Sequence, residues 1–153
     1  LHKLDDFCAE QNVELYVDAV INGVASACIN KEWKALHFVS QMDYNYFNIV
    51  ANMDAFIVDY GVEVFDFLLL HKPMAYMLRD EKEMQRIEGF AFVDLKQVMP
   101  GQHLYNIEDV QAFICAVAKK EDPYQKERDV LYQSMPQSKQ YCKDILDRFQ
   151  IKL

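Results

Sequence analysis

The chain has 153 residues and a net charge of −8, with 52% hydrophobic and 13% aromatic residues. This composition predicts one folded domain with a sizeable core and excludes an intrinsically disordered chain. The acidic balance argues against non-specific binding to nucleic acid or to anionic lipid, because both need a basic surface.

The sequence also limits the compartment in which the protein acts. Its apolar runs fall short of the roughly 20 residues that cross a bilayer, and no signal-peptide pattern opens the chain. The cysteines Cys8, Cys28, Cys115 and Cys142 form no CxxC motif, which is typical of buried free thiols in a reducing compartment. We therefore expect a cytoplasmic protein without a transmembrane segment. Because the chain begins with Leu1 and not with Met, we expect it to be a piece of a longer protein.

The first fifty residues alternate between helical and extended patterns. Apolar spacing predicts a helix ending over Leu4–Gln11, strands Val13–Val17 and Leu36–Val39, a short helix Val24–Ile29 and a helix Tyr44–Asn52. Asp43 is the predicted cap of the last helix, with Phe47, Ile49 and Val50 facing inward.

The central stretch of the chain predicts a strand, a crossover helix and a second parallel strand. The strand Ala55–Tyr60 is apolar throughout, as expected where both faces of a sheet are covered. The following helix carries an apolar stripe that includes Phe65 and Leu69, which we expect to be buried, and it ends before Pro73. Met74–Leu78 is the second buried strand. We expect the two strands to be adjacent, parallel and central in one open sheet.

The rest of the chain is mostly helical. A helix is predicted over Glu81–Glu88, with Asp80 as its cap and Gly89 at its end, followed by an extended segment Phe90–Val93 and a loop at Pro100-Gly101. Asn106 is the predicted cap of a helix over Ile107–Lys120. Two further helices are predicted over Gln125–Ser134 and Ser138–Gln150. The alternation predicts a single α/β domain over residues 1–153 with a doubly wound open parallel sheet of Rossmann-like type, in which residues 124–153 form a helical tail.

In such sheets ligands bind beyond the carboxyl ends of the strands, where helices begin. This rule draws attention to the turn that follows Ala55–Tyr60. Its single glycine, Gly61, does not make a phosphate loop, and a turn of this kind needs a glycine for packing alone. From these residues by themselves, a structural role and a binding role both stay open.

Several separated motifs resemble one known family. Asp54–Tyr60, Val64–Phe67 and Lys72–Met74 are similar to the signature of the CDP-glycerol glycerophosphotransferases, the teichoic-acid and capsule polymerases. Gly89–Phe92 is similar to the family's Gly-Phe-Tyr-Phe, and Pro100-Gly101 to its Ala-Pro-Gly. The motifs occur in the family's order, which makes the resemblance fairly specific.

The resemblance extends over about residues 44 to 117 and implies a fold and a ligand. The family has the two-domain GT-B fold, and this stretch belongs to its C-terminal, donor-nucleotide half. A CDP-linked polyol phosphate is the implied ligand, and the N-terminal GT-B half or another domain of a longer chain is the implied partner. The implied nucleotide- and phosphate-binding residues are Asp59, Tyr60, Gly61, Val62, Glu63 and Asp66.

The same positions depart from the family pattern. The family's paired serines, which offer hydroxyls to the donor phosphates, are Gly61 and Val62 here. Glu63 adds a carboxylate where a phosphate would have to lie, and Asp59 and Asp66 are close in sequence. Each close pair of like charges opposes binding by about 1 kcal/mol in water and by more where water is excluded. We therefore expect weak affinity for CDP.

The histidines that the family is held to use are not found here. Its Lys-x-His-Pro motif corresponds to Val17–Ile21, which has neither the lysine nor the histidine, and Trp33 is not followed by the His-Gly of its Trp-His-Gly motif. We expect structural roles for His37, for His71 at the end of the crossover helix, and for His103 in the loop after Pro100. The sequence predicts no catalytic residue, no metal site and no cofactor.

Two classes of function stay open. The first is the donor half of a transferase that moves glycerol phosphate or a related polyol phosphate from CDP to a polymer, with in-line attack on the phosphate next to the leaving CMP. Such a protein would lie at the inner membrane face through other parts of the chain, and this fragment alone would be inactive. The second is a noncatalytic α/β module descended from that half. A sugar-nucleotide glycosyltransferase ranks last, because its usual Gly-x-x-x-x-Glu helix is not found in the sequence.

Overall fold

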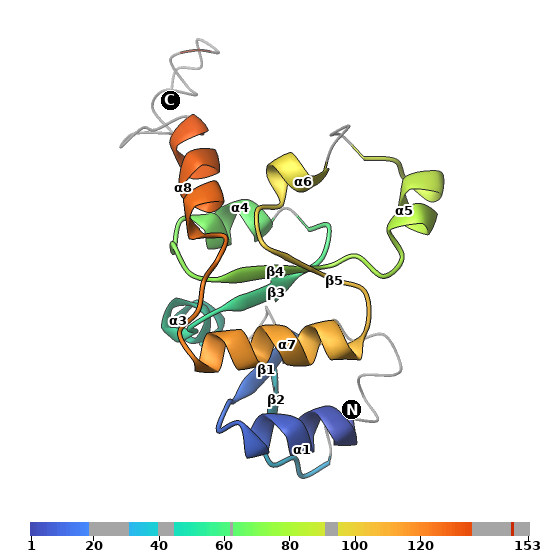
Figure 1. Cartoon of the computed structure of the whole chain (residues 1–153), viewed down its shortest axis with the longest axis vertical. Coiled ribbons are helices and arrows are strands. Elements are labelled where there is room, and N and C mark those ends of the chain that lie inside the picture. Colours follow the sequence, from blue (N-terminus) through green and yellow to red (C-terminus); the bar gives the residue numbers. More distant parts are fainter. Residues whose placement is uncertain (19–30, 40–44, 62, 91–94, 136–147, 149–153) are drawn as a thin grey trace.

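The computed structural model describes residues 1–18, 31–39, 45–61, 63–90, 95–135 and 148. Within these ranges parallel strands alternate with helices, which confirms the predicted α/β, Rossmann-like fold (Figure 1). The predicted helix Val24–Ile29 and the extended segment after Phe90 lie outside the described residues, as do Asp43 and all of Ser138–Gln150 except Arg148.

The three-stranded parallel sheet contains β3 (Phe56–Val58), β4 (Met74–Met77) and β5 (Gln102–Leu104), in that order. In the pairing of β3 with β4, Phe56 lies opposite Met74. The predicted parallel pairing of the two apolar strands is therefore confirmed. The prediction that both are central is wrong for β3, which is an edge strand of this sheet as far as the described residues go.

β5 was not predicted, because residues 100–106 have the composition of a loop. Its backbone nevertheless pairs with β4, with Ala75 opposite Gln102 and Met77 opposite Leu104. Gly101 allows this close approach, because a Cβ there would overlap the Met74 carbonyl oxygen and lie 2.7 Å from Cε2 of Tyr76. Close contact with the neighbouring strand, and not a turn, requires this glycine.

Helices cover both faces of this sheet (Figure 1). α7 (Ile107–Ala118) crosses one face, and α4 (Glu63–Leu68), α6 (Leu95–Val98) and α8 (Gln125–Ser134) lie over the other. α7 begins as predicted, because the Asn106 side chain accepts a hydrogen bond from the Asp109 N–H.

The side chains of β4 alternate between two cores. Met74 and Tyr76 pack in a cluster with Val64 and Leu68 of α4, whereas Ala75 packs in a cluster with Phe113 of α7. Met74, Ala75 and Tyr76 are all at most 1% exposed. This double burial explains why the strand is apolar at every position.

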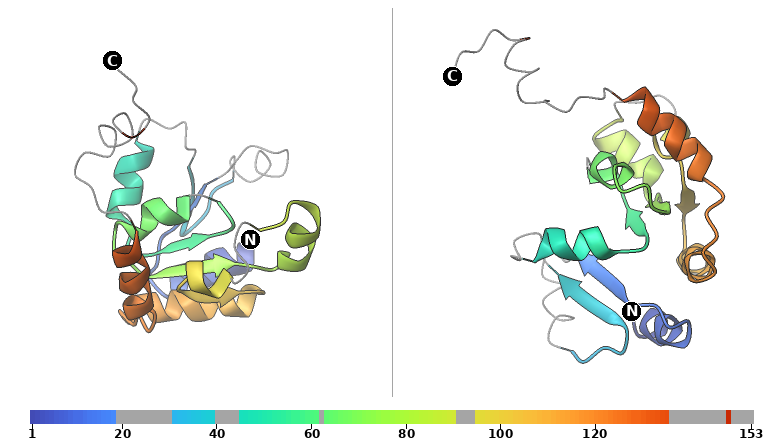
Figure 2. Two further views of the ribbon diagram at one scale, coloured as in Figure 1. Left: turned by 90° about the horizontal axis from the view of Figure 1, so that it is seen from above. Right: turned by 90° about the vertical axis from the view of Figure 1, so that its left-hand side faces the viewer.

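The first two strands, β1 (Leu15–Asp18) and β2 (Leu36–Val39), form a separate parallel pair. Together with α1 (His2–Glu10) they lie at the end of the molecule away from α8 (Figure 2). Cys8 of α1 belongs to the same core cluster as Phe113 of α7. The β1–β2 pair therefore shares a core with the larger sheet, although no backbone pairing joins the two among the described residues.

Two predictions of burial were wrong. Phe47 of α3 (Tyr46–Asn52) is 80% exposed, and Leu69 is 54% exposed. α4 ends at Leu68, so Leu69 lies in the turn that follows the helix and no longer faces the sheet. The buried residues of α4 are Val64 and Leu68, and Phe65 packs against the same core while only partly buried.

The described cysteines are free thiols. Cys8 is buried and Cys115 is partly exposed, whereas Cys28 and Cys142 lie outside the described residues. None of the helices in the described ranges has the length and apolar character that crossing a bilayer requires.

Candidate functional site

The predicted site lies at the carboxyl end of β3. Asp59, Tyr60 and Gly61 form the turn that follows the strand, and Glu63 is the first residue of α4. Val62 lies outside the described residues. Asp66 is exposed and lies farther along α4. The fold thus places this turn where parallel α/β sheets bind ligands.

Two carboxylates surround Gly61. Oδ1 of Asp59 accepts a hydrogen bond from the Gly61 N–H at 3.0 Å. The Glu63 carboxylate folds against the same residue, because a Cβ at position 61 would overlap Glu63 Oε2 and lie 3.4 Å from Asp59 Oδ1. One of the backbone donors expected to face a diphosphate is therefore already bonded within the turn.

Tyr60 connects this turn to the next helix, α5 (Glu81–Ile87). Its hydroxyl donates to Oδ1 of Asp80 at 3.2 Å, and its ring stacks on Phe90 with 5.2 Å between the ring centroids. Burial raises the pKa of the Tyr60 hydroxyl well above its ordinary value, and the neighbouring Asp80 carboxylate raises it further. The phenol therefore stays protonated and remains a hydrogen-bond donor at neutral pH.

The charges of two carboxylates, Asp18 and Glu63, act on the hydroxyl of Tyr46. Burial raises the pKa of the Tyr46 hydroxyl, and the charges of Asp18 and Glu63 raise it further. Tyr46 begins α3, Asp18 ends β1 and Glu63 begins α4.

The described histidines lie away from this turn and have protein partners. His37 contacts Glu14, His71 Nδ1 lies 3.3 Å from Asp129 Oδ1, and His103 Nε2 donates to the Met99 carbonyl at 3.2 Å. The expectation of structural roles agrees with these contacts. His103 lies in β5 and not in a loop, which corrects the prediction. Within the described ranges, no three His, Cys, Asp or Glu residues gather as metal ligands do.

Lys72 has a structural role that sequence reasoning missed. Its Nζ donates to the Ala51 carbonyl at 3.0 Å and to the Met53 carbonyl. These carbonyls lie at the carboxyl end of α3, where a cation is favoured. The Lys-Pro motif therefore fixes α3, which carries Tyr46 at its other end. A lysine just before a strand and a helix end twenty residues earlier are the only sequence signals for this contact.

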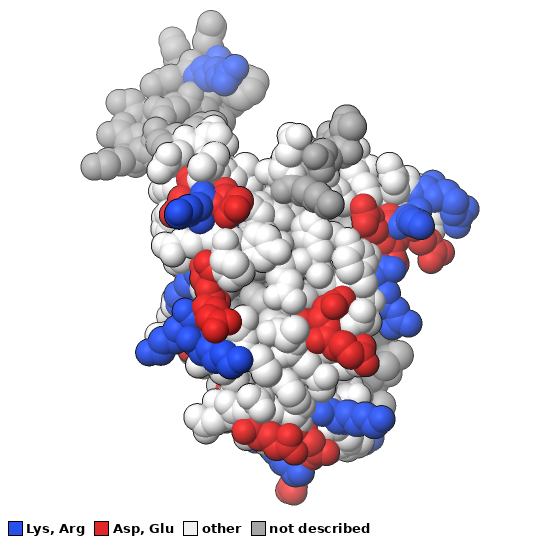
Figure 3. Space-filling model, viewed as in Figure 1, with Lys and Arg blue, Asp and Glu red and all other residues white. Residues whose placement is uncertain are grey.

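An open hollow of about 330 Å³ lies between β1 and α3. Tyr16, Asn45, Asn48, Ile49, Asn52 and Met53 line this hollow. It offers amide groups and one aromatic ring but includes none of the predicted site residues. On the face shown in Figure 3, the described acidic and basic side chains form small separate groups, and neither sign makes a continuous patch.

Comparison with protein families identifies a match over most of the chain. The model of the family described as CDP-Glycerol:Poly(glycerophosphate) glycerophosphotransferase matches residues 24–140, well over half of the chain. The matched range includes the resembling motifs from Asp54 to Gly101, with the β3–α4 turn, Lys72 and Asp80, but it begins after the stretch Val17–Ile21. No curated protein sequence matches the chain.

Proposed function

Because this chain belongs to the CDP-glycerol:poly(glycerophosphate) glycerophosphotransferase family, we propose that it is the donor-nucleotide half of a polyol-phosphate transferase of teichoic-acid or capsule synthesis. The observation that carries this proposal is the family match, whose range of residues 24–140 includes the described strands and helices from β2 to α8. The other half of the enzyme would be supplied by the N-terminal GT-B domain.

In this proposal the turn Asp59–Glu63 faces the diphosphate of a CDP-linked polyol phosphate. The reaction would be an in-line attack of an acceptor hydroxyl on the phosphate next to CMP, and the protein would contribute positioning and charge neutralisation. Asp59, Tyr60, Gly61, Val62, Glu63 and Asp66 are the proposed contact residues. The active protein would work in the cytoplasm, at the inner membrane face.

A second function, that of a noncatalytic binding or regulatory module, is favoured by one specific observation. The Gly61 N–H is bonded to Asp59, and the Glu63 carboxylate occupies the space beside it. Both features oppose a bound diphosphate, because they remove a donor and add negative charge. We expect such a turn in a protein that kept the family's fold but no longer binds the CDP-linked donor.

Titration of CDP and CDP-glycerol, followed by isothermal calorimetry, tests both functions. The unmodified chain should bind CDP weakly, and Glu63→Ser should bind it about fivefold more tightly, since loss of one nearby like charge is worth about 1 kcal/mol. The gain should shrink at higher salt, because ions screen an exposed charge. Glu108→Ser is the matched control, because Glu108 lies in the first turn of another helix, α7.

The outcomes separate the two functions. Weak, salt-dependent binding that Glu63→Ser alone improves supports the donor half. Equal affinities of Glu63→Ser and Glu108→Ser would show that the carboxylate at position 63 does not control the site. Absence of binding in every variant would rule out the donor half and leave the module.

The isolated chain should release no CMP from CDP-glycerol above background in the presence of a polymer acceptor. The reason is that Val17–Ile21, the stretch expected to correspond to the family's Lys-x-His-Pro motif, has neither the lysine nor the histidine that would assist departure of CMP. Chromatographic assay of CMP, with a full-length family enzyme as positive control, measures this. Acceptor-dependent CMP release by this chain alone would contradict the prediction.

A further inference from the structure

We propose that Asp80 is a positioning residue, which holds the β3–α4 turn in place through its hydrogen bond with Tyr60. Its relevance to ligand binding rests on the proposed function, because the turn is the proposed diphosphate site. The contact itself is a property of the folded chain and can be tested without a nucleotide.

The first observation is that the Asp80 side chain does not cap the helix that it precedes. It is the N-cap residue of α5, yet its side chain makes no capping hydrogen bond. An aspartate at this position usually accepts from the second or third N–H of its helix, as the side chain of Asn106 does for α7. Asp80 instead accepts from the Tyr60 hydroxyl at 3.2 Å, across twenty residues of sequence.

The second observation is that both ends of α5 contact the same tyrosine. Asp80 precedes α5 and bonds to the Tyr60 hydroxyl, while Phe90 follows it and stacks on the Tyr60 ring. α5 itself buries none of its residues and projects from the body of the molecule (Figure 1). The segment from Asp80 to Phe90 therefore contacts both the hydroxyl and the ring face of Tyr60.

These contacts act on the turn because Tyr60 lies between its two bonded residues. Asp59 precedes Tyr60 and accepts from the N–H of Gly61, which follows it. Restraint of the Tyr60 side chain therefore restrains the backbone on which both groups are carried. Loss of the Asp80 acceptor should free the tyrosine and loosen the Asp59–Gly61 bond.

The test uses the whole chain and follows the Gly61 amide by NMR, as chemical shift and as hydrogen-exchange rate. Asp80→Ala should shift this amide and speed its exchange at least about threefold. Asp80→Asn, whose amide oxygen can still accept from the phenol, should restore most of the protection. Glu83→Gln is the matched control, because Glu83 is exposed on the same helix and pairs with Arg86 at the surface.

A double-variant cycle separates positioning from a general loss of helix stability. If Asp80 acts through Tyr60, Tyr60→Phe should reproduce the effect of Asp80→Ala, and the two changes together should add little. Additive effects, or an unchanged Gly61 amide in Asp80→Ala, would overturn the inference.

CDP affinity in the Glu63→Ser background gives the second readout. Asp80→Ala should tighten binding several-fold, because it loosens the bond that keeps the Gly61 N–H on Asp59, whereas Glu83→Gln should change the affinity less than twofold. Equal affinities of these two variants would overturn the inference while leaving the donor half intact. If no variant binds CDP, the proposed function fails, and the Gly61 amide still decides whether Asp80 positions the turn.

Discussion

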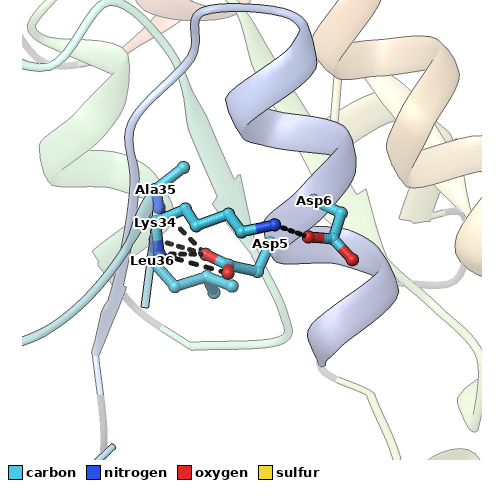
Figure 4. Close-up of polar contacts among 5 residues, drawn as sticks. All are labelled: Asp5, Asp6, Lys34, Ala35 and Leu36. Carbon is cyan, nitrogen blue, oxygen red and sulfur yellow. Dashed lines mark hydrogen bonds and ion pairs between the residues drawn. The ribbon is translucent and has the colours of Figure 1, made fainter. Parts of the chain in front are cut away.

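Asp5 is a buried carboxylate that ties α1 to the segment entering β2 (Figure 4). Only 4% of it is exposed, and its Oδ1 accepts from the N–H groups of Lys34 at 3.0 Å, Ala35 at 2.9 Å and Leu36 at 3.1 Å. Burial alone raises the pKa of this carboxyl, but the backbone donors and the Lys34 charge outweigh it and hold the pKa below its ordinary value. The ionised form of Asp5 is therefore the one that stabilises the fold.

The pH dependence of stability follows from this lowered pKa. The contribution of Asp5 should be complete above the unfolded pKa of about 3.9 and should be lost as pH falls through the lower folded pKa. Asp5→Asn should lower the urea midpoint at pH 7 and flatten its fall below about pH 4. Urea melts from pH 2.5 to 7 measure both effects.

Asp6→Asn is the control for that experiment. Asp6 is adjacent but pairs with Lys34 Nζ at the surface, where the side chains are 53% and 67% exposed, so its loss should change the midpoint little. If the two variants gave the same pH profile, the buried cluster would have no special role in acid stability.

Single residues were predictable from sequence only where the interaction is local. The Asn106 cap was predicted because its partner, Asp109, is three residues away and the pattern is specific. The Asp5 cluster was not, because its donors lie about thirty residues away. The Lys72 contacts with Ala51 and Met53 were missed for the same reason.

At the scale of the element, α4 is too short for apolar spacing to predict the burial of every residue in its stripe. An apolar stripe predicts burial only while the helix continues, and α4 has six residues and ends at Leu68. Leu68 is 2% exposed, whereas Leu69 is 54% exposed. The apolar stripe is present on α4, but Leu69, its last predicted residue, lies beyond the end of the helix.

Substitution of these two neighbours tests this description of α4. Leu68→Ala should lower the free energy of unfolding by about 2–5 kcal/mol, because it leaves a cavity against β4. Leu69→Ala should change it by about 0.5 kcal/mol or less, as exposed positions do. Urea melts of both variants measure the difference. A larger loss from Leu69→Ala than from Leu68→Ala would show that α4 faces the sheet differently.

Strands were predictable where burial dictates the sequence. β3 and β4 are apolar because both of their faces are covered, and β2 was predicted with its observed bounds. β5 was missed because two of its three residues, Gln102 and His103, are polar, and only its pairing with β4 defines it as a strand. Long-range pairing of that kind leaves no local signal.

At the scale of the whole molecule, alternation of strands and helices was enough to predict the fold class. The six proposed contact residues were quoted from the sequence, but the convergence of Asp18, Tyr46 and Glu63 was not predictable. Asp18, Tyr46 and Glu63 belong to β1, α3 and α4, so their electrostatic interaction depends on how these three elements pack.

The whole molecule should unfold in one step, although its described strands form two separately paired sheets. Cys8 of α1 and Ala35, which precedes β2, share one core cluster with Ala75 of β4 and Phe113 of α7, so neither sheet keeps its core when the other opens. Trp33, the only tryptophan, stacks on His2 and reports on the β1–β2 end, whereas far-ultraviolet circular dichroism reports on all helices. The two signals should give coincident urea transitions, and Phe113→Ala should lower both midpoints equally, at a cost of about 3–5 kcal/mol.

Val130→Ala, at a position 68% exposed on α8, should move neither midpoint appreciably and serves as the control. A fluorescence transition separated from the circular-dichroism transition would mean that the β1–β2 end folds as an independent unit, because only a shared core makes the two sheets cooperative.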